Sequence, residues 1–165
     1  MSLAPRSWLV ERCLKEAVFQ FWPTGVTVPE FLGSEGDNLT TLPALRISFM
    51  GATEEPENSG NHLCEVLIEL FGRIDPDNTS STSWGAFEDR VRDHIATAGY
   101  VEEWLTDSLT ESELETTDPN TSSAFTNQLK VHNIRLASFE TDIDTVEGSL
   151  HHSWTLEIYL LQPPD

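Results

Sequence analysis

The sequence predicts an α+β fold, with a mainly antiparallel sheet of about four to five strands and two principal helices packed on one face. Two stretches, 5–21 and 83–98, repeat apolar residues at the 3.6-residue period of an amphipathic helix. Four other stretches alternate apolar and polar residues, as half-buried strands do. The resulting order of helix, hairpin, helix, hairpin is typical of an antiparallel sheet covered by helices. At this length, residues 1–165 are expected to form a single domain.

The central strand is predicted at residues 63–71. Every second position is apolar and is expected to form the dry side of the sheet, namely Cys64, Val66, Ile68 and Leu70. The opposite side is half apolar, because Leu63, Leu67 and Phe71 alternate with Glu65 and Glu69.

The first helix is predicted over residues 5–21. Pro5 suits the first turn of a helix, and Trp22-Pro23 ends it. Glu11 and Lys15 are spaced as an i,i+4 ion pair on the solvated side of this helix.

The first hairpin is predicted to follow an irregular connection over residues 23–43. This connection is rich in Pro and Gly, and residues 25–28 suit a short edge strand. Residues 44–50 are expected to pair antiparallel with the central strand, pointing Leu45, Ile47 and Phe49 inward. Residues 51–61 are polar and acidic and are predicted to be a protruding, mobile loop, either idle or in contact with a partner.

The second helix is expected to start at Ser83 and to stop at Gly99. Its core stripe is predicted to contain Trp84, Phe87, Val91, Ile95 and Ala98. Residues 100–105 suit a short helix or strand, and the acidic stretch 106–128 is predicted to be a mobile loop. Residues 131–139 and 150–161 form the second hairpin, with a tight turn expected at Glu147-Gly148.

The charge balance limits the classes of partner. The chain has 28 acidic and 9 basic residues, a formal charge of -19. This argues against binding to the nucleic-acid backbone, which needs clustered Lys and Arg, and against anionic membranes. Solubility or adaptation to a salty cytoplasm explains the same acidity as well as a functional role does.

The sequence favours an intracellular address. The N-terminus has no basic region followed by an apolar core, and no stretch is long and apolar enough to span a membrane. Cys13 and Cys64 lie on the predicted apolar faces of a helix and a strand, so we expect reduced core thiols.

Motifs for catalysis, metals or cofactors are not found in the sequence. There is no nucleophile elbow and no Gly-rich phosphate loop, and residues 75–86 lack the Gly and the Glu of a calcium loop. Glu140, Asp142 and Asp144 share one side of a strand, and an acidic edge that discourages strand addition is favoured over a cation site. His151 and His152 are expected on opposite faces, with His152 beside Trp154 and His94 at the edge of the helix stripe. We therefore predict no catalytic, metal-binding or cofactor-binding residues.

The layout resembles the tail terminator (minor tail) proteins of long-tailed phages and prophages. The stretches that carry the resemblance are the helix 5–21, the strands 42–47 and 64–72 around an acidic loop, the helix from Trp84, and the closing hairpin with Glu147-Gly148 and 154–159. The resemblance covers most of the chain as a pattern of elements. The acidic stretch 106–128 departs from a small terminator.

The resemblance implies a structural protein and not an enzyme. Proteins of that family form a ring, usually a hexamer, that caps the tail tube and faces the head connector, which places them in the virion or the bacterial host cytoplasm. It makes the acidic loop a candidate contact with a neighbouring subunit or the tube, through Glu54, Glu55, Glu57 and Asn58. Leu67, on the half-apolar side of the central strand, is a candidate contact between subunits.

Two other functions remain open on the sequence. One is a stand-alone acidic adaptor that binds a basic protein partner. The other is a metal-dependent hydrolase that uses the acids between Glu140 and Glu147.

Overall fold

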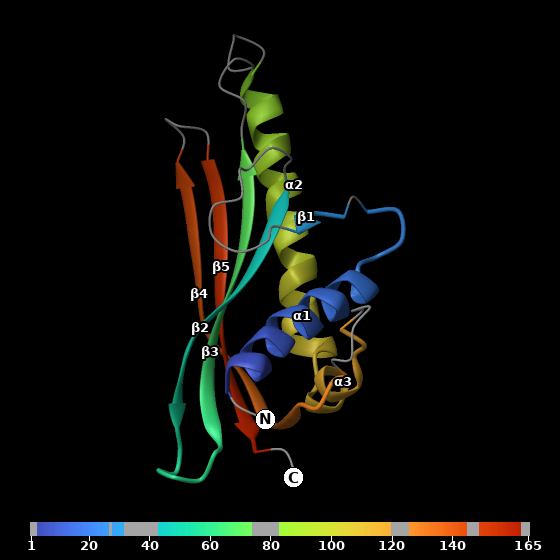
Figure 1. Cartoon of the computed structure of the whole chain (residues 1–165). Coiled ribbons are helices and arrows are strands. Elements are labelled where there is room, and N and C mark those ends of the chain that lie inside the picture. Colours follow the sequence, from blue (N-terminus) through green and yellow to red (C-terminus); the bar gives the residue numbers. More distant parts are fainter. Residues whose placement is uncertain are drawn as a thin grey trace.

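The protein is built on one open five-stranded sheet with its helices on one side (Figure 1). The computed structural model describes residues 3–26, 28–31, 43–73, 83–119, 126–144 and 149–162. The strands lie in the order β1-β2-β3-β5-β4, and every pair is antiparallel except β1 with β2. The predicted α+β class is confirmed.

The central strand is β3 (His62–Arg73), which pairs with β2 (Ala44–Glu54) on one side and β5 (Ser149–Leu161) on the other. Its predicted dry side is fully buried: Cys64, Val66, Ile68 and Leu70. The register places Val66 opposite Phe49 and Leu156, and Ile68 opposite Ile47 and Trp154. One continuous apolar layer therefore crosses three strands and packs under the helices.

Helix α1 (Leu3–Phe21) crosses this layer as predicted, but Glu11 does not lie on a solvated side. Glu11 is half-buried, and its carboxylate accepts the N–H of Phe49 at 2.7 Å. The register of β2 and β3 shifts between Phe49 and Gly51, and the carboxylate satisfies a strand amide beside that bulge. Arg12 and Glu16 of α1 form an i,i+4 ion pair at 3.3 Å.

The first hairpin is longer and more regular than predicted. Strand β2 runs to Glu54 and β3 starts at His62, so only 55–61 of the expected loop lies outside the strands. This end is closed by the hydrogen bond from Glu55 N to Asn61 O at 3.0 Å. It is braced by the buried Arg6 of α1, which donates to the Gly60 carbonyl at 3.3 Å. The short edge strand that the structure describes is β1 (Glu30–Phe31), beside β2, and residues 25, 26 and 28 of the predicted strand are not part of the sheet.

Helix α2 (Ser83–Glu103) continues past Gly99, contrary to the prediction, and runs into the π-helical turn η2 (Trp104–Ser108). The buried stripe is His94, Ala98, Val101 and Leu105, and the expected core residue Ile95 is 51% exposed. A glycine inside a helix costs only about 1 kcal/mol, less than burying the apolar residues that follow it. The side chains of Trp84 and Phe87 lie outside the described part of the chain.

The acidic stretch 106–128 is not simply a loop. It includes α3 (Glu111–Thr116), whose Leu114 is fully buried and whose N-cap Thr110 accepts the N–H of Glu113 at 3.1 Å. The Asn127 amide donates to the carbonyls of Leu114 and Thr117 at 2.8 and 2.9 Å. Polar side chains therefore order a segment whose composition suggested mobility. Residues 120–125 lie outside the described part.

The second hairpin is confirmed, with β4 (Lys130–Asp144) paired antiparallel to β5. The β5 residues predicted to share one side are all buried: Leu150, His152, Trp154, Leu156, Ile158 and Leu160. The turn expected at Glu147-Gly148 lies outside the described residues.

We predict that Gly72→Ala lowers the free energy of unfolding by about 1–3 kcal/mol, because overpacking a rigid site is costly. A Cβ at Gly72 would lie 2.6 Å from Nδ1 of the buried His94 ring. Gly99→Ala is the matched control, because nothing in its surroundings meets the new methyl, and it should gain about 0.5–1 kcal/mol. Urea denaturation measures both.

The same pair of residues provides the decisive check. In a His94→Ala background, Gly72→Ala should cost much less. An unchanged cost would show that the His94 contact is not what limits this site.

Candidate assembly surface

The side of the sheet opposite the helices is the main candidate surface, called the open face here. It is formed by the alternate β3 residues Leu63, Glu65, Leu67, Glu69 and Phe71 and their neighbours on β2, β5 and β4. Helices α1, α2 and α3 all lie on the other side of the sheet (Figure 1). Leu67 is half-buried between Ser48 and Thr155 in the register, on the open face as predicted.

An ion cluster occupies the part of the open face nearest the C-terminal end of β3. Arg46 donates to Oε1 of Glu69 through Nε at 3.0 Å and Nη2 at 2.7 Å. His151 Nε2 lies 2.9 Å from the other carboxylate oxygen, and Phe71 stacks on the His151 ring at 4.9 Å. Glu69 is only 7% exposed, and both its oxygens are engaged. The cluster therefore neutralises a buried carboxylate and stiffens three strands.

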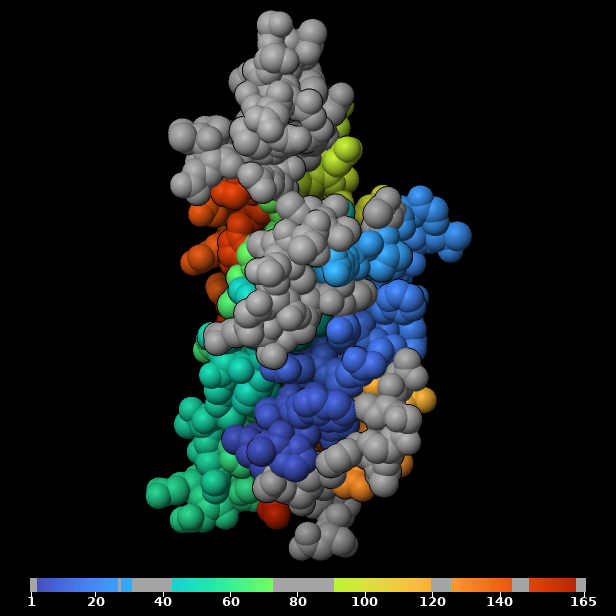
Figure 2. Space-filling model, turned by 45° about the horizontal axis from the view of Figure 1, so that its top comes forward, coloured from blue at the N-terminus to red at the C-terminus, as the bar shows by residue number. Residues whose placement is uncertain are grey.

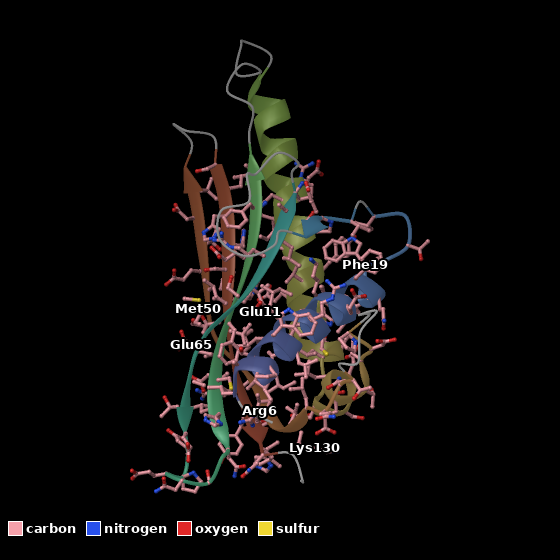
Figure 3. All side chains as sticks on the ribbon, in the orientation of Figure 1. Arg6, Glu11, Phe19, Met50, Glu65 and Lys130 are labelled. Carbon is pink, nitrogen blue, oxygen red and sulfur yellow. The ribbon has the colours of Figure 1, made fainter. Side chains whose placement is uncertain are left out.

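A groove lies on the open face where β2 bulges. It encloses about 410 Å³ and is lined by backbone and side chains of β2, β3 and β5, among them Met50, Leu63, Glu65 and Glu157. Met50 is 58% exposed at the bulge, and Glu157 is paired with Arg135 at 2.7 Å. Met50 and Glu65 lie on the side of the sheet away from α1 (Figure 3). The groove is thus apolar at its wall, with the exposed carboxylate of Glu65 beside it.

The residues proposed in the acidic loop gather at the end of the β2–β3 hairpin, called the hairpin tip. Glu54, Glu55, Glu57 and Asn58 are exposed there. Glu54 is partly engaged, because its carboxylate accepts the N–H of Gly60 at 3.3 Å. Leu67 is not part of this group, since it lies five residues from His62 along β3, roughly 17 Å at the rise of a strand. The candidate contacts therefore form two separate surfaces on one hairpin.

A buried histidine pair lies on the other side of the sheet. His94 Nε2 and His152 Nδ1 are 2.8 Å apart, and His152 stacks on Trp154 as predicted. Burial, reinforced by His152 and His151, lowers the pKa of His94 to about 4. Burial also lowers the pKa of His152. The sequence placed His94 at the edge of the stripe, although its spacing to Ala98 and Val101 is that of a core position.

The two cysteines behave as the sequence predicts. Both are free, buried thiols. Burial raises the pKa of Cys13 to about 12 and that of Cys64 to about 11. Because the thiolate is the reactive form, these side chains act as small hydrophobes of the core.

The acids of β4 form an exposed edge. Glu140 and Asp142 are exposed on this outermost strand, and the side chain of Asp144 lies outside the described residues. Within the described ranges, three or more metal-ligating side chains are nowhere grouped as they would be to hold an ion. The described helices include none with the length and hydropathy of a membrane span.

Comparison with known proteins assigns this chain to no family. No family model matches the sequence, and no curated protein matches it.

The histidine pair predicts a pH dependence of stability. Because the folded pKa of His94 lies near 4 and the ordinary value is 6.5, the unfolded chain takes up the proton first. The stability contributed by neutral His94 is therefore present above about pH 6.5 and is lost as the pH falls toward 4, at up to about 1.4 kcal/mol per pH unit. His94→Gln, which keeps a hydrogen-bond donor, should show a shallower loss of stability over this range.

Urea denaturation at several pH values between 7 and 4 measures this difference. His132→Gln is the control, because His132 is exposed on β4, and it should keep the wild-type profile. Identical profiles for wild type and His94→Gln would contradict the prediction.

Proposed function

We propose that this chain is a structural protein of a phage or prophage tail or neck, a ring-forming tail terminator that caps the tail tube and joins it to the head connector. The observation that carries the proposal is the half-apolar row of β3 residues on the open face, which the helices leave uncovered. In this proposal the chain assembles with copies of itself into a ring, expected to be a hexamer. The ring also binds the tube and connector proteins. Its place is the virion or the bacterial host cytoplasm.

The composition of the open face supports assembly over simple exposure. A sheet face that meets only water usually carries polar residues at every alternate position. Here Leu63, Leu67 and Phe71 alternate with acids on β3, and Met50 protrudes from β2. Four strands about 4.8 Å apart and about twelve residues long offer on the order of 700 Å², close to the roughly 800 Å² that each partner buries in a stable interface.

The hairpin tip and the charge fit the same function. The β2–β3 hairpin projects at the lower end of the molecule, away from the rest of the core (Figure 1). Its exposed Glu55 and Glu57 would contact a neighbouring subunit or the tube. An assembly of chains with a charge of -19 would surround a lumen that repels DNA and keeps it from adhering during passage.

A non-catalytic role agrees with the state of the reactive side chains. The cysteine thiols are held protonated by burial. Glu69 is paired with Arg46 and contacts His151, and the histidine pair is enclosed in the core. We therefore assign these groups to stability. A stand-alone acidic adaptor for a basic protein is the alternative outcome of the experiment below.

We predict that Leu67→Glu breaks the oligomer while leaving the fold intact, because the new carboxylate would be half-buried in the single chain and fully buried only in the interface. Size exclusion with light scattering should show subunits in place of a closed oligomer, with the unfolding midpoint shifted by only a few degrees. Ile95→Glu, at an apolar position on α2 that is 51% exposed and lies on the other side of the sheet, is the control and should leave assembly unchanged.

The wild-type chain must first form a closed oligomer, alone or with tube protein, visible by negative-stain microscopy. A chain that stays monomeric even with tube protein would refute the ring and favour the adaptor.

A further inference from the structure

A basic and aromatic stripe runs along the outer side of α1. It consists of Trp8, Arg12, Lys15 and Phe19, which recur at i, i+4, i+7 and i+11 and share one side of the helix. Trp8 is 43% and Phe19 is 55% exposed, whereas the buried residues of α1 lie on its opposite side. Figure 2 shows α1, in dark blue, at the surface of the molecule. Two large exposed aromatic side chains thus flank two cations.

The charge of the α1 stripe is opposite to that of the chain. The stripe has two basic residues, Arg12 and Lys15, and no acidic one, while Arg6 is buried on the opposite side of the helix. The chain as a whole has 28 acidic and 9 basic residues. Arg12 is held in place by Glu16 at 3.3 Å and by the Pro119 carbonyl at 2.8 Å. The α1 stripe is therefore a basic surface on an acidic protein, and its complement is present on the protein itself.

That complement is the groove at the β2 bulge. Its wall is apolar at Met50 and Leu63, and Glu65 supplies the carboxylate, since Glu157 is paired with Arg135. The stripe lies on the side of α1 away from the sheet, because the buried residues of α1 are on its opposite side. The groove lies on the other side of the sheet, where Met50 and Glu65 are labelled (Figure 3). One copy can therefore present α1 to the open face of the next copy without using its own open face.

We propose that the α1 stripe of one copy docks on the bulge groove of the next copy, as the repeating contact of the ring. This inference rests on the ring-forming function proposed above and names its interface. Trp8 and Phe19 cover the apolar wall, and Lys15 faces the carboxylate of Glu65. Each interface joins two different surfaces, so it is heterologous, and such contacts close into a ring when the rotation between copies allows it. Each sheet then has helices on both sides, its own on one side and α1 of the next copy on the open face.

The test uses charge reversal and mixing of variants. Lys15→Glu and Glu65→Lys each bring like charges together at every interface, so each alone should self-associate at least tenfold more weakly than wild type. An equimolar mixture of the two should assemble again. When the two variants alternate around the ring, one interface joins the two substituted positions, where both charges are reversed and still attract. The next interface joins the unchanged Lys15 and Glu65, as in the wild type. Light scattering after size exclusion measures each sample, at the ionic strength at which the wild type assembles.

The matched control is Glu57→Lys, a reversal at the hairpin tip of the same hairpin. Its mixture with Lys15→Glu should not restore assembly. Thermal unfolding confirms that each variant is folded, and Phe19→Ala provides a second, uncharged probe that should also weaken assembly at least tenfold. Restoration by Glu57→Lys and not by Glu65→Lys would overturn the inference in favour of the hairpin tip.

The remaining outcomes separate the two proposals. If the wild type assembles and Lys15→Glu and Phe19→Ala assemble equally well, the α1 interface is wrong and the ring stands. If the single variants are defective and their mixture stays unassembled, the pairing of Lys15 with Glu65 is wrong. A wild type that never assembles overturns both proposals.

Discussion

The fold depends on the burial of one side of β3. Cys64, Val66, Ile68 and Leu70 are fully buried beneath the helices, and the register carries the same apolar layer onto β2 and β5. Each such side chain contributes about 1.5–3 kcal/mol. Because a strand alternates its side chains, this burial also commits Leu63, Leu67 and Phe71 to the open face. The core and the candidate assembly surface are therefore two consequences of one register.

Some of the acidic residues stabilise the fold, a role that the net charge alone does not reveal. Glu11 satisfies the Phe49 amide of β2, and Glu111 and Glu115 accept the amides of Ile134 and Val131 on the edge strand β4, at 2.7, 3.3 and 2.6 Å respectively. Strand amides left open at a sheet edge are templates for aggregation. Carboxylates from neighbouring helices occupy these positions, so part of the charge protects the edges and another part, on the open face and the hairpin tip, is available for assembly.

Much of the candidate surface could be predicted from the sequence. Alternation alone placed Leu67 on the uncovered side, and the polar run placed Glu55 and Glu57 at the end of a hairpin. The sequence could not show that β2 bulges after Phe49, because a bulge changes the register without a sequence motif here. The groove beside Met50 and the separation between Leu67 and the hairpin tip follow from that register and from the length of the strands.

The sequence by itself determined the class of fold, the central strand, the two hairpins and the reduced core cysteines, since each depends on local periodicity. Only the tertiary structure decided where α2 ends, which of its residues are buried and how residues 106–119 are ordered. Ile95 is exposed and His94 is buried because the position of the sheet beneath α2 decides which side of the helix is buried. The His94–His152 contact joins residues 58 positions apart, and such a contact is selected by packing and not by any local pattern.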